Sequence, residues 1–241
     1  MGYYGGYGRY GGYYGFDWTY LLVIVGVIIT AIASSHVTSV YKRYAGIRAA
    51  SGLTGAQTAA EILRRNGITD VTIQHVPGSL TDHYNPAKKV VNLSDAVYGQ
   101  TSVAAIGVAA HECGHVIQHH RGYVPLSIRT ALVPIANIGS NLGIWIVIAS
   151  IILGLSGTLT TIGVVLFSFG TLFQIVTLPV EFNASNRALT MLRDYGILGM
   201  DEEKKARAVL RAAAMTYVAA AASSLLQLVR LLAIANGRRR R

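Results

Sequence analysis

The chain has 241 residues, of which 52% are hydrophobic and only 13% are charged, and its formal net charge is +10. A charged fraction of about half the usual value excludes a disordered protein and an ordinary cytosolic enzyme, and indicates a membrane protein. The basic residues are few and scattered, so we expect them to face anionic membrane lipids and expect no nucleic-acid partner. A single cysteine, Cys113, excludes an intramolecular disulfide and four-cysteine metal sites.

The N-terminal part predicts a tail and a transmembrane anchor. Residues 1–16 are rich in Gly and Tyr and predict a flexible tail, because such repetition cannot build a core. Residues 17–41 predict the anchor, since residues 18–40 contain His36 but no Asp, Glu, Lys or Arg and can cross a hydrocarbon core of roughly 30 Å. The alternative is a signal peptide cleaved near Ala33. We expect a retained anchor, because the apolar run continues past that site and only Arg9 precedes it.

Residues 42–129 predict a small α+β unit. Thr54 and Gln57 have the spacing of a capping box at the start of a helix that Gly67 would stop. Residues 71–73 and 90–93 predict two short strands with turn residues between them. A further helix, rich in Val, Ala and Gly, is expected from about residue 102 to residue 119.

Residues 130–180 are 51 consecutive residues without Asp, Glu, Lys, Arg or His, which predicts a transmembrane hairpin with its turn near residues 155–158. Nine Lys and Arg residues lie in 41–129 and eleven in 181–241, so the positive-inside rule places both segments in the cytoplasm. Residues 181–241 predict helices and a basic tail. For the apolar stretch 216–236 we favour a helix packed on the protein or lying at the interface over a membrane span, which would put Arg230 in lipid.

The predicted helix 102–119 carries the sequence His111-Glu112-Cys113-Gly114-His115, an H-E-x-x-H motif. Residues four apart share one face of a helix, so both imidazoles can point at one metal ion. Glu112 lies beside that face, where it can take a proton from metal-bound water and later pass it to the leaving amine. The competing interpretation is a pair of structural histidines.

A catalytic zinc needs a third protein ligand, and the acidic residues after the motif are few. Glu181 is favoured, because two membrane spans return the chain to the side on which it left after Arg129. The alternatives are that Glu181 is merely a charge at a helix end, and that Asp194 or the acidic cluster 201–203 provides the ligand. His119 lies one turn beyond His115 and is a poor third ligand.

Three segments of the chain resemble bacterial YugP-type membrane zinc metallopeptidases: residues 102–119, residues 78–86 and residues 178–185. The resemblance covers about residues 18–232. It implies a zincin-like catalytic unit in residues 42–129 and one Zn²⁺ per chain. By analogy with related gluzincins of the HtpX kind, which carry an E-x-x-x-D segment, it implies Glu181 as the third ligand. Ser185 stands where those relatives carry Asp, so support for a ligand histidine differs here.

Weaker candidates surround this motif. His83 and Tyr84, expected in the turn before residue 90, and Arg187 could stabilise an oxyanion or bind substrate. Otherwise His83 and Tyr84 shape the turn, and Arg187 pairs with an acid or a lipid. The strand 90–93 could be an edge strand on which an extended substrate adds itself. The remaining histidines, His36, His75, His119 and His120, and Cys113 are expected to be structural or at the surface.

These observations predict a mainly α, multi-pass integral membrane protein with a small α+β catalytic unit, a transmembrane hairpin and C-terminal helices. The predicted function is a zinc-dependent endopeptidase at the cytoplasmic membrane surface, acting on peptide or membrane-protein substrates. The alternative is a zinc-binding but inactive membrane scaffold or chaperone subunit. A transporter is disfavoured, because the hairpin carries no charges along a path. Homo-oligomerisation and partner proteins stay open.

Overall fold

The computed structural model describes residues 18–239, so the predicted Gly/Tyr tail and residues 240–241 lie outside the described residues. Six helices and three strands follow in chain order: α1 (Tyr20–Ala45), α2 (Gly55–Arg65), β1 (Thr72–Val76), β2 (His83–Asn85), β3 (Val90–Ser94), α3 (Val103–His120), α4 (Val124–Ile152), α5 (Gly157–Asp194) and α6 (Met200–Arg239).

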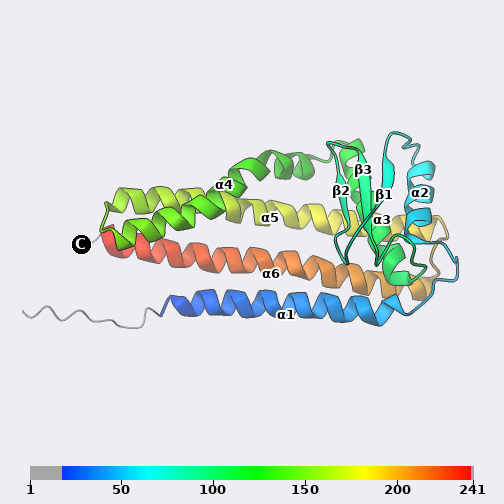
Figure 1. Cartoon of the computed structure of the whole chain (residues 1–241), viewed down its shortest axis with the longest axis horizontal. Helices are drawn as coiled ribbons and strands as arrows, with labels where there is room; N and C mark the ends of the chain where they lie inside the picture. Colours follow the sequence, from blue (N-terminus) through cyan, green and yellow to red (C-terminus); the bar gives the residue numbers. More distant parts are fainter. Residues whose placement is uncertain (1–17, 240–241) are drawn as a thin grey trace, which may run out of the picture.

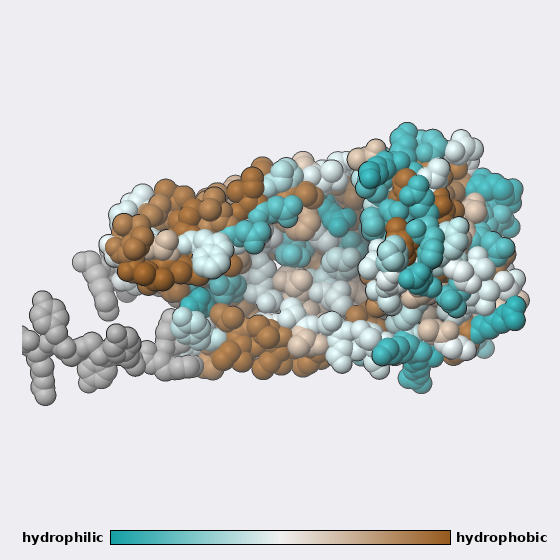
Figure 2. Space-filling model, in the orientation of Figure 1, coloured by the Kyte–Doolittle hydropathy of each residue, from teal (hydrophilic) through white to brown (hydrophobic). Residues whose placement is uncertain are grey.

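Four long helices form the membrane part of the molecule. They lie in a row in which α4 packs on α5, α5 on α6 and α6 on α1 (Figure 1). Each is long and apolar enough to cross a bilayer. On the face that Figure 2 shows, hydrophobic side chains gather on the part of the bundle away from the sheet, whereas hydrophilic ones gather over the sheet end. The predicted fold class, a mainly α membrane protein with a small α+β unit, is confirmed.

Small residues hold the hairpin α4–α5 together. A Cβ atom added at Gly143 would come within 2.7 Å of the Gly163 carbonyl oxygen, and one at Gly163 would come within 2.8 Å of the Gly143 carbonyl oxygen. Such close approach is how membrane helices gain packing contacts without a hydrophobic driving force between them. The helix α5 does not end where the apolar stretch ends at Val180, but continues to Asp194 and carries Glu181 out of the apolar region.

The C-terminal helix packs on the protein, which is one of the two favoured expectations, and it is also long and apolar enough to cross a membrane. α6 is continuous over 40 residues, packs along α1 and α5, and is a fourth candidate span. It ends beside the start of α1 (Figure 1). The cost of Arg230 in a span is reduced because its guanidinium lies over the Tyr20 ring, 4.2 Å from the ring centroid, near the end of the bundle. This pairing joins residues far apart in the sequence, so local hydropathy could not reveal it.

The α+β unit consists of α2, α3 and a three-stranded sheet in the order β1-β3-β2. β3 pairs in parallel with β1 and antiparallel with β2, and all five of its residues are buried. The expectation that residues 90–93 form an edge strand is therefore wrong. The two edge strands are β1 and β2, and β2 contains His83 and Tyr84, both expected in a turn. A three-residue strand is too short to show alternation of polar and apolar residues.

The helix α3 is enclosed by the rest of the protein. It packs against α2 and the sheet on one side and against α5 and α6 on the other. Ser102 caps its first turn by accepting a hydrogen bond from the Ala105 amide at 3.2 Å, and most of its residues are buried. The predicted helix at Thr54 is confirmed as α2, with both hydrogen bonds of the capping box formed. This packing holds the H-E-x-x-H segment at the junction between the sheet and the bundle.

If α6 crosses the membrane, the two ends of the bundle lie on opposite sides of it. Single cysteines introduced as Lys88→Cys, in the sheet unit, and Gly237→Cys, at the end of α6, should react with an impermeant maleimide in membrane vesicles of opposite orientation. The wild type is the control, because its Cys113 is buried and should stay unlabelled. Labelling of both cysteines in the same vesicles would show that α6 does not cross.

Candidate active site

His111 and His115 come together on one face of α3. Their ring centroids are 4.7 Å apart and the rings are nearly perpendicular. Residues four apart in a helix lie one turn apart on the same side, so the motif spacing brings the two Nε2 atoms toward the same point. That point lies against α5.

Glu181 reaches this point from α5. Its Oε2 atom is 3.2 Å from Nε2 of His111 and 3.6 Å from Nε2 of His115, and only 2% of the side chain is exposed. The ligand atoms of the three residues lie within 4.8 Å of one another. Among the described residues Glu181 Oε2 has no hydrogen-bond partner. A buried carboxylate oxygen without a partner is costly, and a cation between it and two imidazoles removes that cost.

The electrostatics of the site also suit a cation. Burial lowers the pKa of His115, but the nearby carboxylates of Glu181 and Glu112 and the contact with Gln118 raise it by more, so that the net shift is upward. The surroundings therefore favour positive charge at this point. Two neutral imidazoles and one carboxylate are a usual ligand set for a catalytic zinc with an open fourth position. His111, His115 and Glu181 therefore fit a Zn²⁺ ion.

The approach of Glu181 to the two histidines depends on a close crossing of α3 and α5. A Cβ atom added at Gly114 would come within 2.6 Å of the Ala184 carbonyl oxygen. Any other residue at position 114 would push the helices apart. Gly114 occupies one of the two unspecified positions of the motif, and here its missing side chain lets the two histidines approach Glu181.

Both histidines are oriented by partners on their other nitrogen. Nδ1 of His111 lies 3.1 Å from the Ser185 hydroxyl oxygen, and Nδ1 of His115 lies 3.0 Å from Oε1 of Gln118. Such partners fix the tautomer and leave Nε2 free for a metal. Ser185, where the sequence left the support of a histidine in doubt, thus contacts His111.

Sequence reasoning missed Gln118, although it lies three residues after His115 on the same helix. Its Nε2 donates hydrogen bonds to the Val180 carbonyl oxygen at 2.8 Å and to Oδ1 of Asn183 at 3.0 Å. The side chain is fully buried. Because both ends of the amide are fixed, Gln118 holds His115 and also ties α3 to α5.

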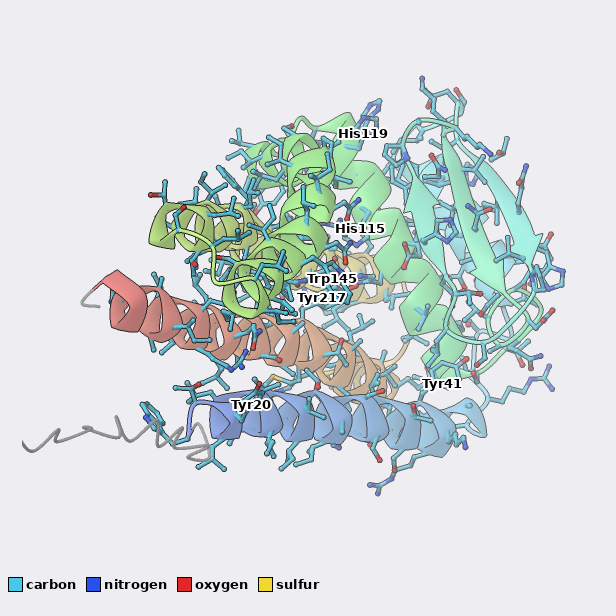
Figure 3. The ribbon with its side chains drawn as sticks, turned by 60° about the vertical axis from the view of Figure 1, so that its left-hand side comes forward. Tyr20, Tyr41, His115, His119, Trp145 and Tyr217 are labelled. Atoms are coloured by element: carbon cyan, nitrogen blue, oxygen red, sulfur yellow. The ribbon has the colours of Figure 1, made fainter. Side chains whose placement is uncertain are left out.

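A cavity of about 650 Å³ opens at the three clustered residues. Its walls come from β2, from α3, from the first turns of α4, and from α5 and α6. Glu112 also lines the cavity, but it is not one of the three residues that could hold a metal ion. Figure 3 shows His115 on α3 near Tyr217 of α6, and both side chains line this cavity. Arg129 of α4 also lines it, with its Nη2 atom 3.9 Å from Oε1 of Glu181.

Tyr217 and Arg129 were not among the predicted site residues. In the sequence, Tyr217 lies in an alanine-rich stretch that carries no motif. Arg129 was used only to mark the last charged residue before the hairpin. Their positions depend on how distant helices pack, which no local pattern shows.

The predicted oxyanion candidates take different places. His83 lines the cavity, but its Nδ1 is 2.9 Å from the Thr81 carbonyl oxygen and its Nε2 is 3.1 Å from Nδ2 of Asn92, so both nitrogens are occupied. The Tyr84 hydroxyl lies 3.0 Å from Nδ1 of His119 at the cavity wall. Arg187 is not among the lining residues, because it points to Asn183 on another face.

The other candidates stay away from the three clustered residues. Cys113 is buried against the Ala59 carbonyl oxygen, and burial raises the pKa of its thiol, so it is not prepared to bind a metal as thiolate. His75 pairs with Asp95 at the surface, with the two atoms 2.7 Å apart. His119 lines the cavity but stands outside the ligand cluster.

Comparison with protein families matches residues 19–236 to the family described as "Putative neutral zinc metallopeptidase". The chain belongs to this family. It is 44% identical over 207 residues to the "Putative membrane protease YugP" of Bacillus subtilis (strain 168), a match that covers 86% of this chain and 92% of that protein. No solved structure matches significantly. The resemblance found in the sequence is thereby confirmed.

Zinc binding should depend on the α3–α5 crossing as well as on the ligands. Glu181→Ala removes a ligand, and Gly114→Val forces α3 away from Ala184, so we expect each to weaken zinc affinity at least about tenfold. The measurement is chelator competition followed by elemental analysis of the purified protein. Cys113→Ala is the control and should keep the wild-type affinity. Equal zinc in wild type and Glu181→Ala would remove Glu181 from the ligand set.

Proposed function

We propose that the protein is a membrane-bound, zinc-dependent endopeptidase. The observation that carries this proposal is the convergence of His111, His115 and Glu181 beside Glu112 at the floor of a cavity large enough for a peptide. A zinc ion held by these three residues would act as a Lewis acid on a carbonyl and lower the pKa of bound water. Side chains of this chain transfer the proton, stabilise the oxyanion and bind the substrate.

Glu112 is the general base and then the general acid. It lies in the cavity wall directly after His111, and it is largely buried. From there its carboxylate takes a proton from the attacking water and delivers it to the nitrogen of the leaving amine. Glu181, by contrast, faces both histidines and has the place of a ligand.

Tyr217 is the best-placed donor for the oxyanion. It lies on α6 and lines the same cavity as Glu112 and the two histidines of the motif (Figure 3). A preorganised donor stabilises the charge that develops on the carbonyl oxygen during attack. His83 is less suitable because both of its ring nitrogens are already engaged.

The substrate backbone would lie along β2. This short strand is an edge of the sheet, pairs on its other side with β3, and contributes His83 and Tyr84 to the cavity wall. An extended peptide can add to such an edge through main-chain hydrogen bonds. This arrangement would place a peptide bond in front of α3.

The site would face the cytoplasm. It lies at the end of the bundle where α1 finishes and α6 begins (Figure 1). Fifteen Lys and Arg residues lie in the segments at this end, nine in 41–129 and six in 187–211, whereas the hairpin turn has none and the last stretch of the sequence, 230–241, has five. The positive-inside rule favours this side as cytoplasmic. Peptide segments of membrane proteins near the lipid surface would be the substrates.

A zinc-binding scaffold without catalysis is the second candidate, since His111, His115 and Glu181 alone would bind the metal. Glu112 distinguishes the two functions. In Glu112→Gln we expect full zinc content but a fall of about 10²–10⁴-fold in kcat on a membrane-protein substrate, measured by cleavage in detergent or in vesicles. If Glu112→Gln were as active as the wild type, the mechanism would be contradicted. If neither the wild type nor Glu112→Gln cleaved the substrate, the scaffold function would be favoured.

Tyr217→Phe removes one hydroxyl and leaves the ring. If Tyr217 stabilises the oxyanion, kcat should fall about 100-fold with little change in KM, because the interaction forms in the transition state. Tyr84→Phe is the matched control and should have a smaller effect, since the Tyr84 hydroxyl is paired with His119. Equal losses in the two variants would count against the role of Tyr217.

A further inference from the structure

A second, smaller hollow meets the active-site cavity on the other side of Glu112. It has a volume of about 220 Å³ and lies between α1, α3 and α6. The two hollows share five lining residues, namely Asp82, His111, Glu112, Glu181 and Tyr217. The candidate catalytic residues thus form a partition with an open space on each side.

The far walls of the second hollow are apolar. They include Val37 from α1, Leu80 from the loop before β2, Val108 from α3, and Leu210, Ala213 and Ala214 from α6. The polar residue of α6 on this wall is Thr216, whose hydroxyl donates a hydrogen bond to the Ala213 carbonyl oxygen. The two alanines leave space where a larger residue would fill it. Polar groups are found mainly on the side of the catalytic residues, where Asp82 and Glu112 add negative charge.

We propose that this hollow, the Ala213 pocket, binds an apolar side chain of the substrate residue next to the scissile bond. The inference rests on the proposed peptidase function and names the specificity of that same site. A substrate backbone held before His111 and Glu112 must place the side chains flanking the scissile bond close to the shared partition. On the α1 and α6 side, that side chain meets aliphatic walls.

The size of the pocket favours one occupant. Ligand sites for whole small molecules usually measure about 300–1,000 Å³, so a space of about 220 Å³ suits a single large side chain rather than a helix or a longer segment. Leu, Met and Phe gain most from burial against aliphatic walls. Asp and Glu are disfavoured, because their carboxylates would lie beside Asp82 and Glu112.

The test uses peptides that differ only at one residue next to the cleaved bond, with Gly, Ala, Leu, Phe or Asp there. For the wild type we expect kcat/KM for Leu and Phe to exceed that for Gly by about 10–100-fold, and Asp to be poorest. Ala213→Phe fills the pocket and should reverse the order, so that Gly and Ala are preferred. Val108→Ala enlarges the pocket and should raise the preference for Phe over Leu.

Ala220→Phe is the matched control. It adds the same ring on α6, seven residues further along the helix and outside the lining of the pocket, and should keep the wild-type order. Zinc content and thermal stability of each variant show that it is folded. If Ala213→Phe does not fold, the preference of Val108→Ala for Phe over Leu still tests the proposal.

The same peptides, labelled with a fluorophore, are also tested for binding to Glu112→Gln. This readout separates the pocket from catalysis. An apolar preference in binding that Ala213→Phe reverses supports the pocket even if no variant cleaves, in which case the proposed function alone fails. If the wild type does not discriminate among the peptides, the proposal is overturned. This result is expected if a lipid chain, and not a substrate side chain, fills the pocket. An order of preference that Ala213→Phe leaves unchanged also overturns the proposal.

Discussion

The site depends on the contact between Gly114 of α3 and the Ala184 backbone of α5. At this crossing the helices approach so closely that a single Cβ atom would not fit. The same short part of α5 supplies Glu181 to the two histidines, Ser185 to Nδ1 of His111, and acceptors to Gln118. One interhelical contact therefore brings together the three candidate ligands and the residues that orient them.

This crossing also makes the membrane bundle part of the site. α5 is a candidate span and at the same time carries Glu181 beyond the apolar region. α4 brings Arg129 and α6 brings Tyr217 to the same cavity. Arg129 approaches Oε1 of the buried Glu181 carboxylate, but Oε2 has no hydrogen-bond partner among the described residues, and a zinc ion is the cation that the donor set suits at that atom. Metal binding and bundle packing should thus stabilise each other.

The parts predictable from the sequence are those set by local spacing or by extremes of composition. His111 and His115 share a face because they are four apart on one helix, and the hairpin is evident from a long stretch without charges. Glu181 could be selected because the chain has so few acidic residues after the motif. The capping box at Thr54 is equally local.

The parts that escaped prediction depend on distant contacts. Tyr217 joins the cavity through the packing of α6 on α1 and α5, and local hydropathy does not show which helices α6 contacts. Arg230 is accommodated by Tyr20, more than 200 residues away in the chain. β2 exists because β3 offers it a partner, and its three residues carry no pattern of their own. In each case the decisive partner comes from another element.

The most direct test of the account is the X-ray absorption spectrum of zinc bound to the wild-type protein. The structure predicts two imidazole nitrogens and carboxylate or water oxygens at about 2.0–2.2 Å from the metal, with no sulfur. A Glu181→Ala sample, if it retains zinc, should show altered oxygen scattering and the same two imidazoles. A sulfur at about 2.3 Å, or fewer than two imidazoles in the wild type, would contradict a site built from His111, His115 and Glu181.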